Sequence, residues 1–473
     1  MRLFGRTFEY KWVVAAVFVS GLFLDIIDTT IVNVALPSLA TDFRTDSVEW
    51  VVLGYTLSLA VWIPASGWFG DRYGTKRVMM TAMGLFVAGS VLCGTAQSIG
   101  QLITFRVLQG VGGGMMTPVG IAMLFRSFPP AERARAATVT MVPTMIAPAL
   151  GPVLGGYLIG SFGWRWIFYI NIPIGVATLV FGLKYLRESR EPTAGRFDAA
   201  GFLTSGAALA LIVFALSEGP RSGWLSMPVV AAGLVGLVSA VAMVIIETRI
   251  DQPMLALRLF RDRMFLASNL VGIFSMGSFI GLMFLVPLYL QTVRGFTPLQ
   301  AGASTFTQAI GIFLSTQVSG RLYTRIGPRR LIFGGLLAAS VANALFVTVN
   351  ASSAVWTVRG LFLVRGLCMG MAFVPMQAAT YATIAPSDNG RASSIFSTMR
   401  QVSISLAIAA LATILASYTI VGRAATDVAR ATRGFHIGYL VTAVLALAGA
   451  LMALRIRDAD ALSTMKARSE PTP

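Results

Sequence analysis

The chain has little of what enzymes and soluble proteins rely on. Charged residues make up 12% of its 473 residues, against about 25% in an average soluble protein. Its single histidine, His436, and its two cysteines, Cys93 and Cys368, lie far apart in the sequence, so no metal cluster or nucleophile constellation is apparent. The glycine-lysine motif of P-loop ATPases is also absent. We therefore expect no enzyme activity, no metal and no cofactor.

Hydrophobic sequence, in contrast, is abundant. Hydrophobic residues make up 56% of the chain, and apolar runs of about 20 residues, long enough to cross a bilayer as helices, recur from end to end. These features indicate an all-α polytopic membrane protein. We predict 14 transmembrane helices near residues 12–36, 48–69, 78–97, 100–124, 137–160, 166–186, 200–216, 227–246, 264–291, 299–318, 331–349, 356–383, 392–416 and 435–454.

The net charge of +17 has a topological explanation. Most of the 37 Lys and Arg fall in the predicted loops on the side of both termini. The positive-inside rule places that side in the cytoplasm, which gives an N-in, C-in protein of the cytoplasmic (inner) membrane. The basic loops would also attract anionic membrane lipids. Because the charges are scattered over many short loops, we expect no nucleic-acid partner, and we expect a monomer.

The two halves of the chain repeat one pattern. Residues 67–77 join spans two and three, and residues 320–330 join spans ten and eleven with matching glycines and basic residues. Arg106 in span four corresponds to Arg365 in span twelve. Parallel repeats around a midplane site are typical of transporters. The predicted division is a six-helix bundle at 1–186, a linker with two additional transmembrane helices at 187–263, a second six-helix bundle at 264–455 and a flexible cytoplasmic tail at 456–473.

Two acids, Asp25 and Asp28, lie deep inside the first predicted span. A carboxylate near the bilayer centre is costly to keep charged, so it needs a partner or a proton, and such acids are rare and usually functional. Three residues apart on a helix, the two would titrate as a coupled pair. Arg106 needs a partner for the same reason. The alternative for the two acids is that they are unimportant polar residues in a water-filled groove, and for Arg106 that it only ties helices together through backbone carbonyls.

Five segments in order carry a family resemblance: 28–37, 67–77, 106–114, 147–156 and 164–173. They resemble the major facilitator superfamily and, within it, the 14-span drug:proton antiporter family. The resemblance implies the major facilitator fold, two six-helix bundles plus two extra helices. It also implies a proton-coupled secondary active exporter, an antiporter of lipophilic or cationic compounds that works by alternating access and contributes to multidrug efflux.

The resemblance also implies residue roles. Asp28 would carry the proton under the influence of Arg106, while Asp25, which departs from the common pattern, would be auxiliary. Asp71 would latch the two halves together on the cytoplasmic side, and the span-five motif, whose Gly-x-x-x-Gly spacing lets another helix approach closely, would mark an exporter. The predicted latch comprises Gly67, Asp71, Arg72, Gly74 and Arg77, and the predicted antiporter motif comprises Pro148, Gly151, Pro152, Gly155 and Gly156.

A pocket for lipophilic substrates needs aromatic, thioether and amide surface with few fixed charges. The residues predicted to line it are Asn33, Gln109, Met116, Met145, Phe284, Gln291, Gln308 and Gln377. Met276 and Phe279 are further candidates, although residues of this kind serve equally in packing or face lipid.

A lipid function is the main alternative within transport. An exporter or flippase of lipids or lipid-like metabolites could load its substrate from one leaflet, and the helix pair at 200–246 suits either reading. Among non-transport membrane proteins, a channel would need a repeated filter segment, which the sequence lacks. A structural protein would have little use for two midplane acids.

Overall fold

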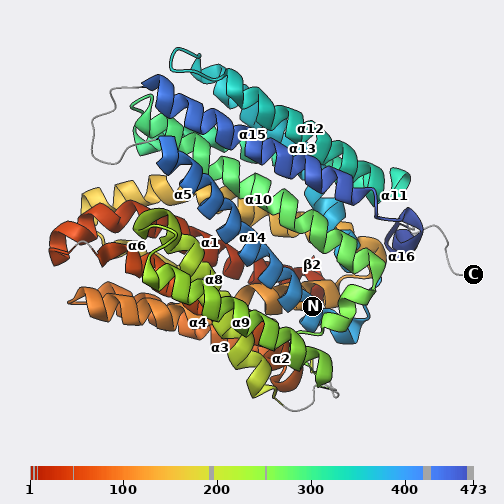
Figure 1. Ribbon diagram of the computed structural model, residues 1–473. Helices are drawn as coiled ribbons and strands as arrows, with labels where there is room; N and C mark the ends of the chain where they lie inside the picture. The colour runs from red at the N-terminus through yellow and green to blue at the C-terminus, as the bar shows by residue number, and fades with distance from the viewer. Residues whose placement is uncertain are drawn as a thin grey trace, which may run out of the picture.

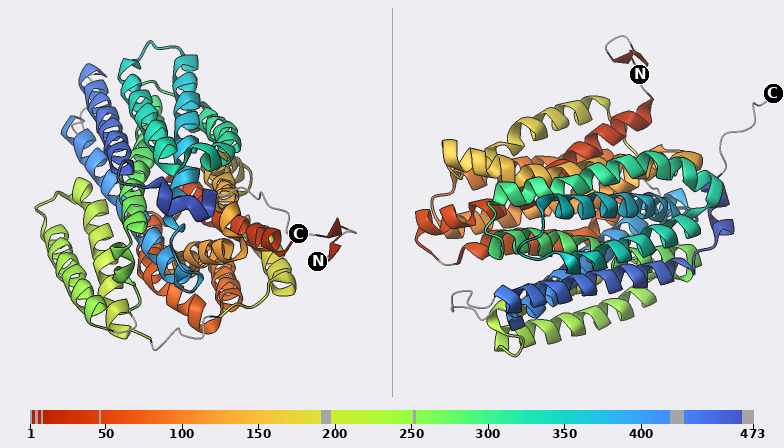
Figure 2. Two further views of the ribbon diagram at one scale, coloured as in Figure 1. Left: turned by 90° about the vertical axis from the view of Figure 1, so that its right-hand side faces the viewer. Right: turned by 90° about the horizontal axis from the view of Figure 1, so that it is seen from above.

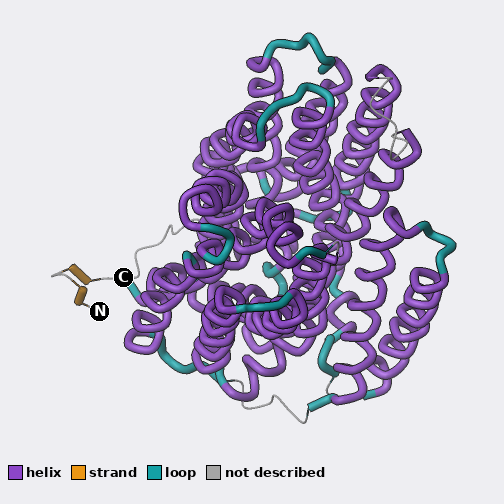
Figure 3. The backbone as a smooth tube through the Cα atoms, turned by 90° about the vertical axis from the view of Figure 1, so that its left-hand side faces the viewer, coloured by secondary structure: helices purple, strands orange, loops and turns teal. Residues whose placement is uncertain are grey.

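The computed structural model describes residues 2–3, 6–7, 9–45, 47–190, 197–250, 253–418 and 428–465. Long helices that run side by side make up almost all of this part of the chain (Figures 1 and 3). A short antiparallel pair of strands, β1 (Arg2–Leu3) and β2 (Arg6–Thr7), precedes the first helix. The all-α architecture predicted from the hydrophobic runs is therefore confirmed.

The helices pack in two groups with one pair between them in the sequence. The first group, called the N-group below, contains α1 (Tyr10–Phe43), α2 (Trp50–Tyr73), α3 (Thr75–Thr95), α4 (Ile99–Ser127), α5 (Arg133–Phe162), α6 (Trp166–Tyr169) and α7 (Asn171–Tyr185). The second, the C-group, contains α10 (Arg263–Thr292), α11 (Pro298–Ile326), α12 (Pro328–Leu345), α13 (Val355–Thr380), α14 (Asn389–Tyr418) and α15 (Val428–Ala453). The pair is α8 (Ala199–Ser222) and α9 (Met227–Arg249), and a short α16 (Leu462–Met465) follows the C-group.

Short 3₁₀ turns connect several of these helices. They lie at Ser47–Glu49, Pro130–Glu132, Leu257–Arg261, Phe346–Thr348, Pro386–Asp388 and Asp458–Ala461.

Twelve helices in the described residues are long and apolar enough to cross a membrane. The helices α5 and α11, of 30 and 29 residues, lie where the two remaining spans are predicted. The total of 14 spans and the cytoplasmic location of the termini stay predictions, as do the exact bounds of the bundles.

One end of the helix bundle carries both ends of the described chain. Lys11 Nζ, at the start of α1, lies 2.7 Å from Glu132 Oε2 in the loop before α5. The same loop contacts α16, near the end of the chain. Figure 2 shows the two termini emerging at this end, which we call the terminal end.

The pair α8–α9 lies beside the seam between the two groups. The helix α8 packs against α2 of the N-group and α14 of the C-group, whereas α9 packs mainly on α8 at the edge of the molecule (Figure 2). The outer face of α9 is apolar and exposed, as a lipid-facing surface would be. The exposed side chains include Leu234, Val235, Leu237, Val238 and Val241.

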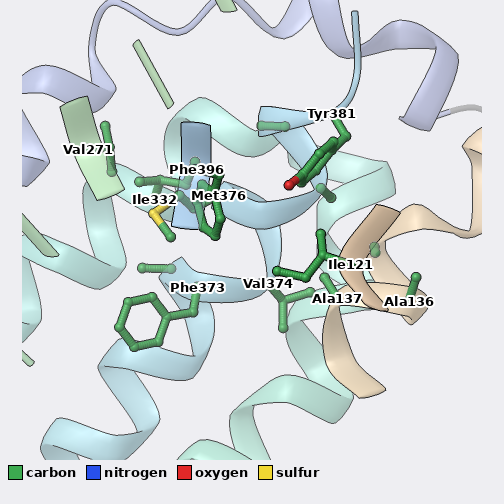
Figure 4. Packing of buried hydrophobic residues seen from close by; sticks show 14 of the residues in the cluster. Ile121, Ala136, Ala137, Val271, Ile332, Phe373, Val374, Met376, Tyr381 and Phe396 are labelled. Carbon is green, nitrogen blue, oxygen red and sulfur yellow. The ribbon is translucent and has the colours of Figure 1, made fainter. Parts of the chain in front are cut away.

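The two groups share a hydrophobic core. The helix α5 contacts α11 and α13, and α14 contacts α2 and α4. One cluster of buried side chains runs from Phe18 and Ile121 in the N-group to Phe373 and Phe396 in the C-group. Figure 4 shows part of this packing.

Candidate functional site

Asp28 lies in a closed polar network inside the N-group. Its side chain is 0% exposed. Arg106 Nη1 on α4 lies 2.5 Å from Asp28 Oδ2. Gln109 Nε2 and Asn171 Nδ2 donate hydrogen bonds to the other carboxylate oxygen at 3.0 and 2.9 Å. Gln109 Nε2 also donates to Ser90 Oγ on α3 at 2.7 Å. Three neighbouring helices thus supply the hydrogen bonds that a buried ion pair needs.

Tyr55 on α2 connects this network to the second acid. The Arg106 guanidinium lies 4.2 Å from the centroid of the Tyr55 ring, a cation–π contact. The Tyr55 hydroxyl donates to Asp25 Oδ1 at 2.5 Å, and Thr117 Oγ1 donates to the other oxygen at 3.4 Å. Asp25 and Asp28 are therefore linked through a single ring, and a change in charge at one acid affects the other.

A cavity of about 50 Å³ lies between the two groups. Aromatic and thioether side chains of the C-group form much of its wall, and Figure 4 shows Phe373, Met376 and Phe396 gathered on this side. Thr117, the residue that donates to Asp25, contributes to the N-group side, whereas Asp28 does not line the cavity. The lining residues are Phe18, Leu22, Thr117, Ile121, Thr140, Met276, Phe279, Phe373, Met376, Gln377, Phe396 and Arg400.

The C-group holds a counterpart of the Arg106 site that lacks an acid. Arg365 on α13 is fully buried, and its Nε donates to Asn343 Oδ1 at 2.8 Å. Its Nη1 donates to Gln308 Oε1, and its Nη2 donates to the carbonyl oxygens of Ser278 and Phe279 at 3.1 and 3.0 Å. The sequence repeat is thus visible in space, but among the described residues the guanidinium is paired with a carboxylate in the N-group copy alone.

Asp71, near the end of α2, contacts both groups. Arg126 Nη2 lies 2.6 Å from Asp71 Oδ1, and Arg126 Nε donates to Pro386 O of the C-group at 3.2 Å. A Cβ added at Gly390 would lie 2.7 Å from either Asp71 carboxylate oxygen. Asp71 therefore lies against the N-terminus of α14, where the helix dipole favours a negative charge.

Gly67 lies where α2 and α14 approach each other closely. A Cβ at this position would lie 2.5 Å from Gly390 O and 2.6 Å from Ser394 Oγ. The backbone N–H of Gly67 donates to Ser394 Oγ at 2.9 Å, and Ser66 Oγ lies 3.2 Å from the same oxygen. These contacts, together with those of Asp71, hold the two groups together at the terminal end.

Among the described residues, no hydrogen bond or ion pair joins the remaining predicted latch residues to the C-group. Arg72 is exposed, and Arg77 Nε lies 3.7 Å from Glu188 Oε2. Gly74 ends α2 with φ +101°, a conformation that favours glycine. In the repeat at 320–330, the Thr324 hydroxyl only bonds Arg321 O of its own helix.

The predicted antiporter motif packs α5 against α1. A Cβ at Gly151 would lie 2.2 Å from Thr30 Oγ1, and one at Gly155 would lie 3.0 Å from Ile31 Cγ1. A Cβ at Gly156 would meet nothing within 4 Å. Pro148 is half-buried on the same helix, and the Pro152 side chain lies outside the described residues.

Gln377 lines the cavity, as predicted. Among the described side chains, it is the one predicted cavity residue that does. Gln109 and Gln308 instead bond the two buried arginines, as described above. The remaining predicted residues lie elsewhere: Asn33 and Gln291 are exposed and bond carbonyls of their own helices, Met116 is packed in the N-group core, Phe284 packs in the C-group, and the Met145 side chain lies outside the described residues.

Tyr55, Thr117 and Arg400 were not predicted to belong to the site. The sequence did offer one indication for Arg400, because a charged residue within an apolar span is often functional. Tyr55 and Thr117 carried no such indication, because a Tyr or Thr in a membrane helix is common.

Sequence and structure comparisons identify the family and the fold. The family model described as "Major Facilitator Superfamily" matches residues 18–408 and also residues 269–471. The chain belongs to the major facilitator superfamily.

Individual relatives in this superfamily cover most of the chain. "Multidrug resistance protein B homolog" from Mycobacterium tuberculosis is 34% identical over 396 residues, 82% of this chain and 73% of its own length. MdtD from Serratia proteamaculans is 31% identical over 466 residues, which cover 97% of this chain and 95% of the relative. The crystal structure of the human organic anion transporter MFSD10 superposes with a TM-score of 0.65, covering 94% of this chain and 99% of MFSD10. At 16% identity, that likeness bears on the fold alone.

Proposed function

We propose that this chain is a proton-coupled exporter of lipophilic or cationic compounds, working by alternating access in the cytoplasmic membrane. Membership of the superfamily and the multidrug-resistance names of its relatives support drug export. The observation that carries the proton coupling is the linkage from the Asp28–Arg106 ion pair through Tyr55 to Asp25, beside a cavity between the two groups.

In this proposal Asp25 and Asp28 have different roles. Asp25 exchanges a proton or a substrate cation with the cavity, since its hydrogen-bond donor Thr117 lines it. Loss of the negative charge at Asp25 weakens the hydrogen bond that the Tyr55 hydroxyl donates to it. The ring of Tyr55 also makes the cation–π contact with Arg106. The Asp28–Arg106 pair then responds through a shift of α1 relative to α4. Each bond in the chain is between different helices of the N-group, so protonation changes how the helices pack.

The conformation described here fits one end of such a cycle. Arg126, Gly67 and Ser394 join the groups at the terminal end, which is predicted to be cytoplasmic. In the proposed cycle these contacts break when the cavity opens to the cytoplasm to receive substrate. They form again when the substrate leaves on the other side of the membrane.

Purified protein in liposomes with an imposed pH gradient tests the proposal. We expect a lipophilic cationic dye to move against its gradient with the wild type. Asp28→Asn and Asp25→Asn should each lower gradient-driven movement by at least about tenfold, because neither amide can carry a proton. Asp42→Asn is the matched control, since Asp42 lies on the same helix but is exposed and accepts from Trp164 Nε1.

Two results would contradict the proposal. Dye movement that ignores the pH gradient would exclude proton coupling. Movement of a fluorescent phospholipid, with no movement of the dye, would replace the proposal with lipid export.

A further inference from the structure

Arg400, on α14, faces the cavity but has no part in the proposed proton pathway. It lines both the central cavity and a smaller one of about 10 Å³ between α10, α13 and α14. Within the part of the chain that the structure describes, no hydrogen bond or ion pair holds its guanidinium. A guanidinium in a membrane protein is costly to leave without a partner, and such charges mark ligand pathways. Arg400 is therefore available to a ligand.

The polar groups next to Arg400 are mainly hydrogen-bond donors. Gln377 Oε1 already accepts from Thr140 Oγ1 at 2.8 Å, which leaves the Gln377 amide nitrogen as a donor. The Tyr381 hydroxyl is buried, has no hydrogen-bond partner in the described residues and interacts electrostatically with Arg400. The Tyr381 ring lies beside Phe396 of the cavity wall, 6.3 Å between centroids. A cation among unused donors matches an anionic group such as a carboxylate.

The carboxylate of Asp25 lies on the N-group side of the cavity, opposite Arg400. Asp25 on α1 interacts electrostatically with Arg400, but the two side chains do not form an ion pair. A purely cationic substrate at Asp25 would meet the positive charge of Arg400, and a purely anionic one at Arg400 would meet the carboxylate of Asp25. A substrate that carries both charges satisfies both residues.

We infer that the cavity binds amphipathic zwitterions, compounds that carry a cationic amine and a carboxylate on one apolar body. Arg400 binds the carboxylate and Asp25 binds the amine, while the aromatic and thioether wall contacts the body. This rests on the proposed function: the amine at Asp25 takes the place of the proton, so that substrate and proton exclude each other as exchange requires.

The cavity must widen to admit such a compound. Pockets for drug-sized ligands measure about 300–1,000 Å³, and this one measures about 50 Å³. Asp25 and Arg400 belong to different groups, so separation of the groups enlarges the space between the two charges. Met276 and Met376 in the wall have flexible side chains that can repack around ligands of different shape.

Two dyes that differ by one ester test the inference. Rhodamine 110 carries a cationic ring system and a free carboxylate, and rhodamine 123 is its methyl ester, which keeps the cation and loses the anion. We expect purified wild-type protein in detergent to bind rhodamine 110 roughly tenfold more tightly, measured by fluorescence anisotropy, because a charged hydrogen bond to Arg400 is added. Arg400→Gln should remove this preference by weakening the binding of rhodamine 110, while the ester should bind at least as tightly as to the wild type, because the positive charge that its cation meets is gone. Arg400→Lys should restore part of the preference.

In the Arg400 variants, the affinity for the ester also reports whether the protein is folded. The inference would be overturned if the wild type bound the two dyes with equal affinity. It would also be overturned if Arg400→Gln lost affinity for both dyes to the same extent. Asp25→Asn should lower the affinity for both dyes, since both carry the cation. If the affinity for both dyes stayed unchanged, Asp25 would not belong to the binding site. If a pH gradient drives the ester into liposomes but no preference for rhodamine 110 exists, this inference fails while the proposed function stands. If neither dye responds to the gradient, the proposed function fails.

Discussion

Two buried arginines show how one neighbour decides what a charged site can do. Arg106 is paired with Asp28, a group that can take up a proton. Arg365, at the corresponding place in the second half, is held by the neutral side chains of Gln308 and Asn343 and by carbonyl oxygens. A neutral amide cannot titrate, so the C-group site can stabilise the structure but cannot couple it to protons.

Substitution of Gln308 tests this difference. We expect Gln308→Leu to lower the free energy of unfolding by about 1–3 kcal/mol, because Arg365 loses a buried acceptor. The pH dependence of transport should stay that of the wild type. Thermal unfolding of purified protein and transport at several pH values measure the two effects. Gln291→Leu is the control, since Gln291 is exposed and bonds only Pro287 O of its own helix. A changed pH profile in Gln308→Leu would contradict the assignment of proton coupling to the N-group alone.

The need of Arg106 for a polar partner could be anticipated because a charge inside a bilayer is costly to leave unpaired, and the family resemblance implied that Asp28 is the acid concerned. The first argument concerns a single residue and needs no knowledge of the neighbours. The role of Tyr55 could not be found in this way, since it depends on which face of α2 turns toward α1 and α4. Several polar residues predicted for the cavity lie elsewhere for the same reason: polarity shows that a side chain needs a partner but not where that partner lies.

At the scale of helices, the contact between α2 and α14 controls closure of the terminal end. Gly67 has no space for a Cβ, because Gly390 O and Ser394 Oγ already lie where it would go. We expect Gly67→Ala to open this end more often, since overpacking costs about 1–3 kcal/mol in the closed state.

Thiol labelling measures this opening. In a chain with Cys93 and Cys368 replaced by serine, a cysteine introduced as Thr140→Cys should react with a maleimide about fivefold faster or more when Gly67 is alanine. Thr140 lines the cavity. Gly84→Ala is the matched control, because a Cβ at that position meets nothing within 4 Å. Equal labelling rates in the two variants would show that Gly67 does not limit closure.

The close contact between α1 and α5 also depends on glycines, Gly151 and Gly155, at which a Cβ would meet side chains of α1. A Cβ at Gly151 would collide with Thr30 Oγ1, which bonds the carbonyls of Ile26 and Ile27 and cannot rotate without losing them. We expect Gly151→Ala to lower the free energy of unfolding by about 1–3 kcal/mol and to reduce transport.

On the same helix, Gly156→Ala should change neither stability nor transport, since space is open there. Thermal unfolding in detergent and dye export from liposomes compare the two variants. If both behaved alike, the packing of α5 on α1 would not depend on the position of these glycines.

The sequence predicts that span five meets another helix closely, because Gly-x-x-x-Gly spacing leaves a flat face. It does not identify α1 as that helix, since the spacing describes one surface and not its partner. The sixth span is predicted as one segment, and Trp166–Tyr185 is one candidate membrane span, in which a single turn residue, Ile170, separates α6 from α7. Hydrophobicity indicates where a helix crosses a membrane and is insensitive to such local breaks.

At the scale of the whole molecule, the five ordered segments were enough to predict the superfamily, the hydrophobic runs were enough to predict a helical membrane protein, and the repeated motifs indicated two similar bundles. The placement of α8 and α9 was not predictable from them. These helices have no counterpart in either half, and their position beside α2 and α14 follows from packing surfaces that only the folded molecule shows.

Alternating access requires the two groups to separate at the terminal end during each cycle. Ser66 Oγ on α2 and Ser394 Oγ on α14 lie 3.2 Å apart, so cysteines at these two positions, in the chain otherwise free of cysteine, should form a disulfide upon oxidation. We expect the oxidised double variant to export no dye, because the bond holds the groups in the closed arrangement and the cavity cannot open at the terminal end to receive substrate. Reduction should restore export. Ser66→Cys alone, treated with the same oxidant, should transport as before. Export by the cross-linked protein at the rate of the reduced one would mean that substrate crosses without separation of α2 from α14.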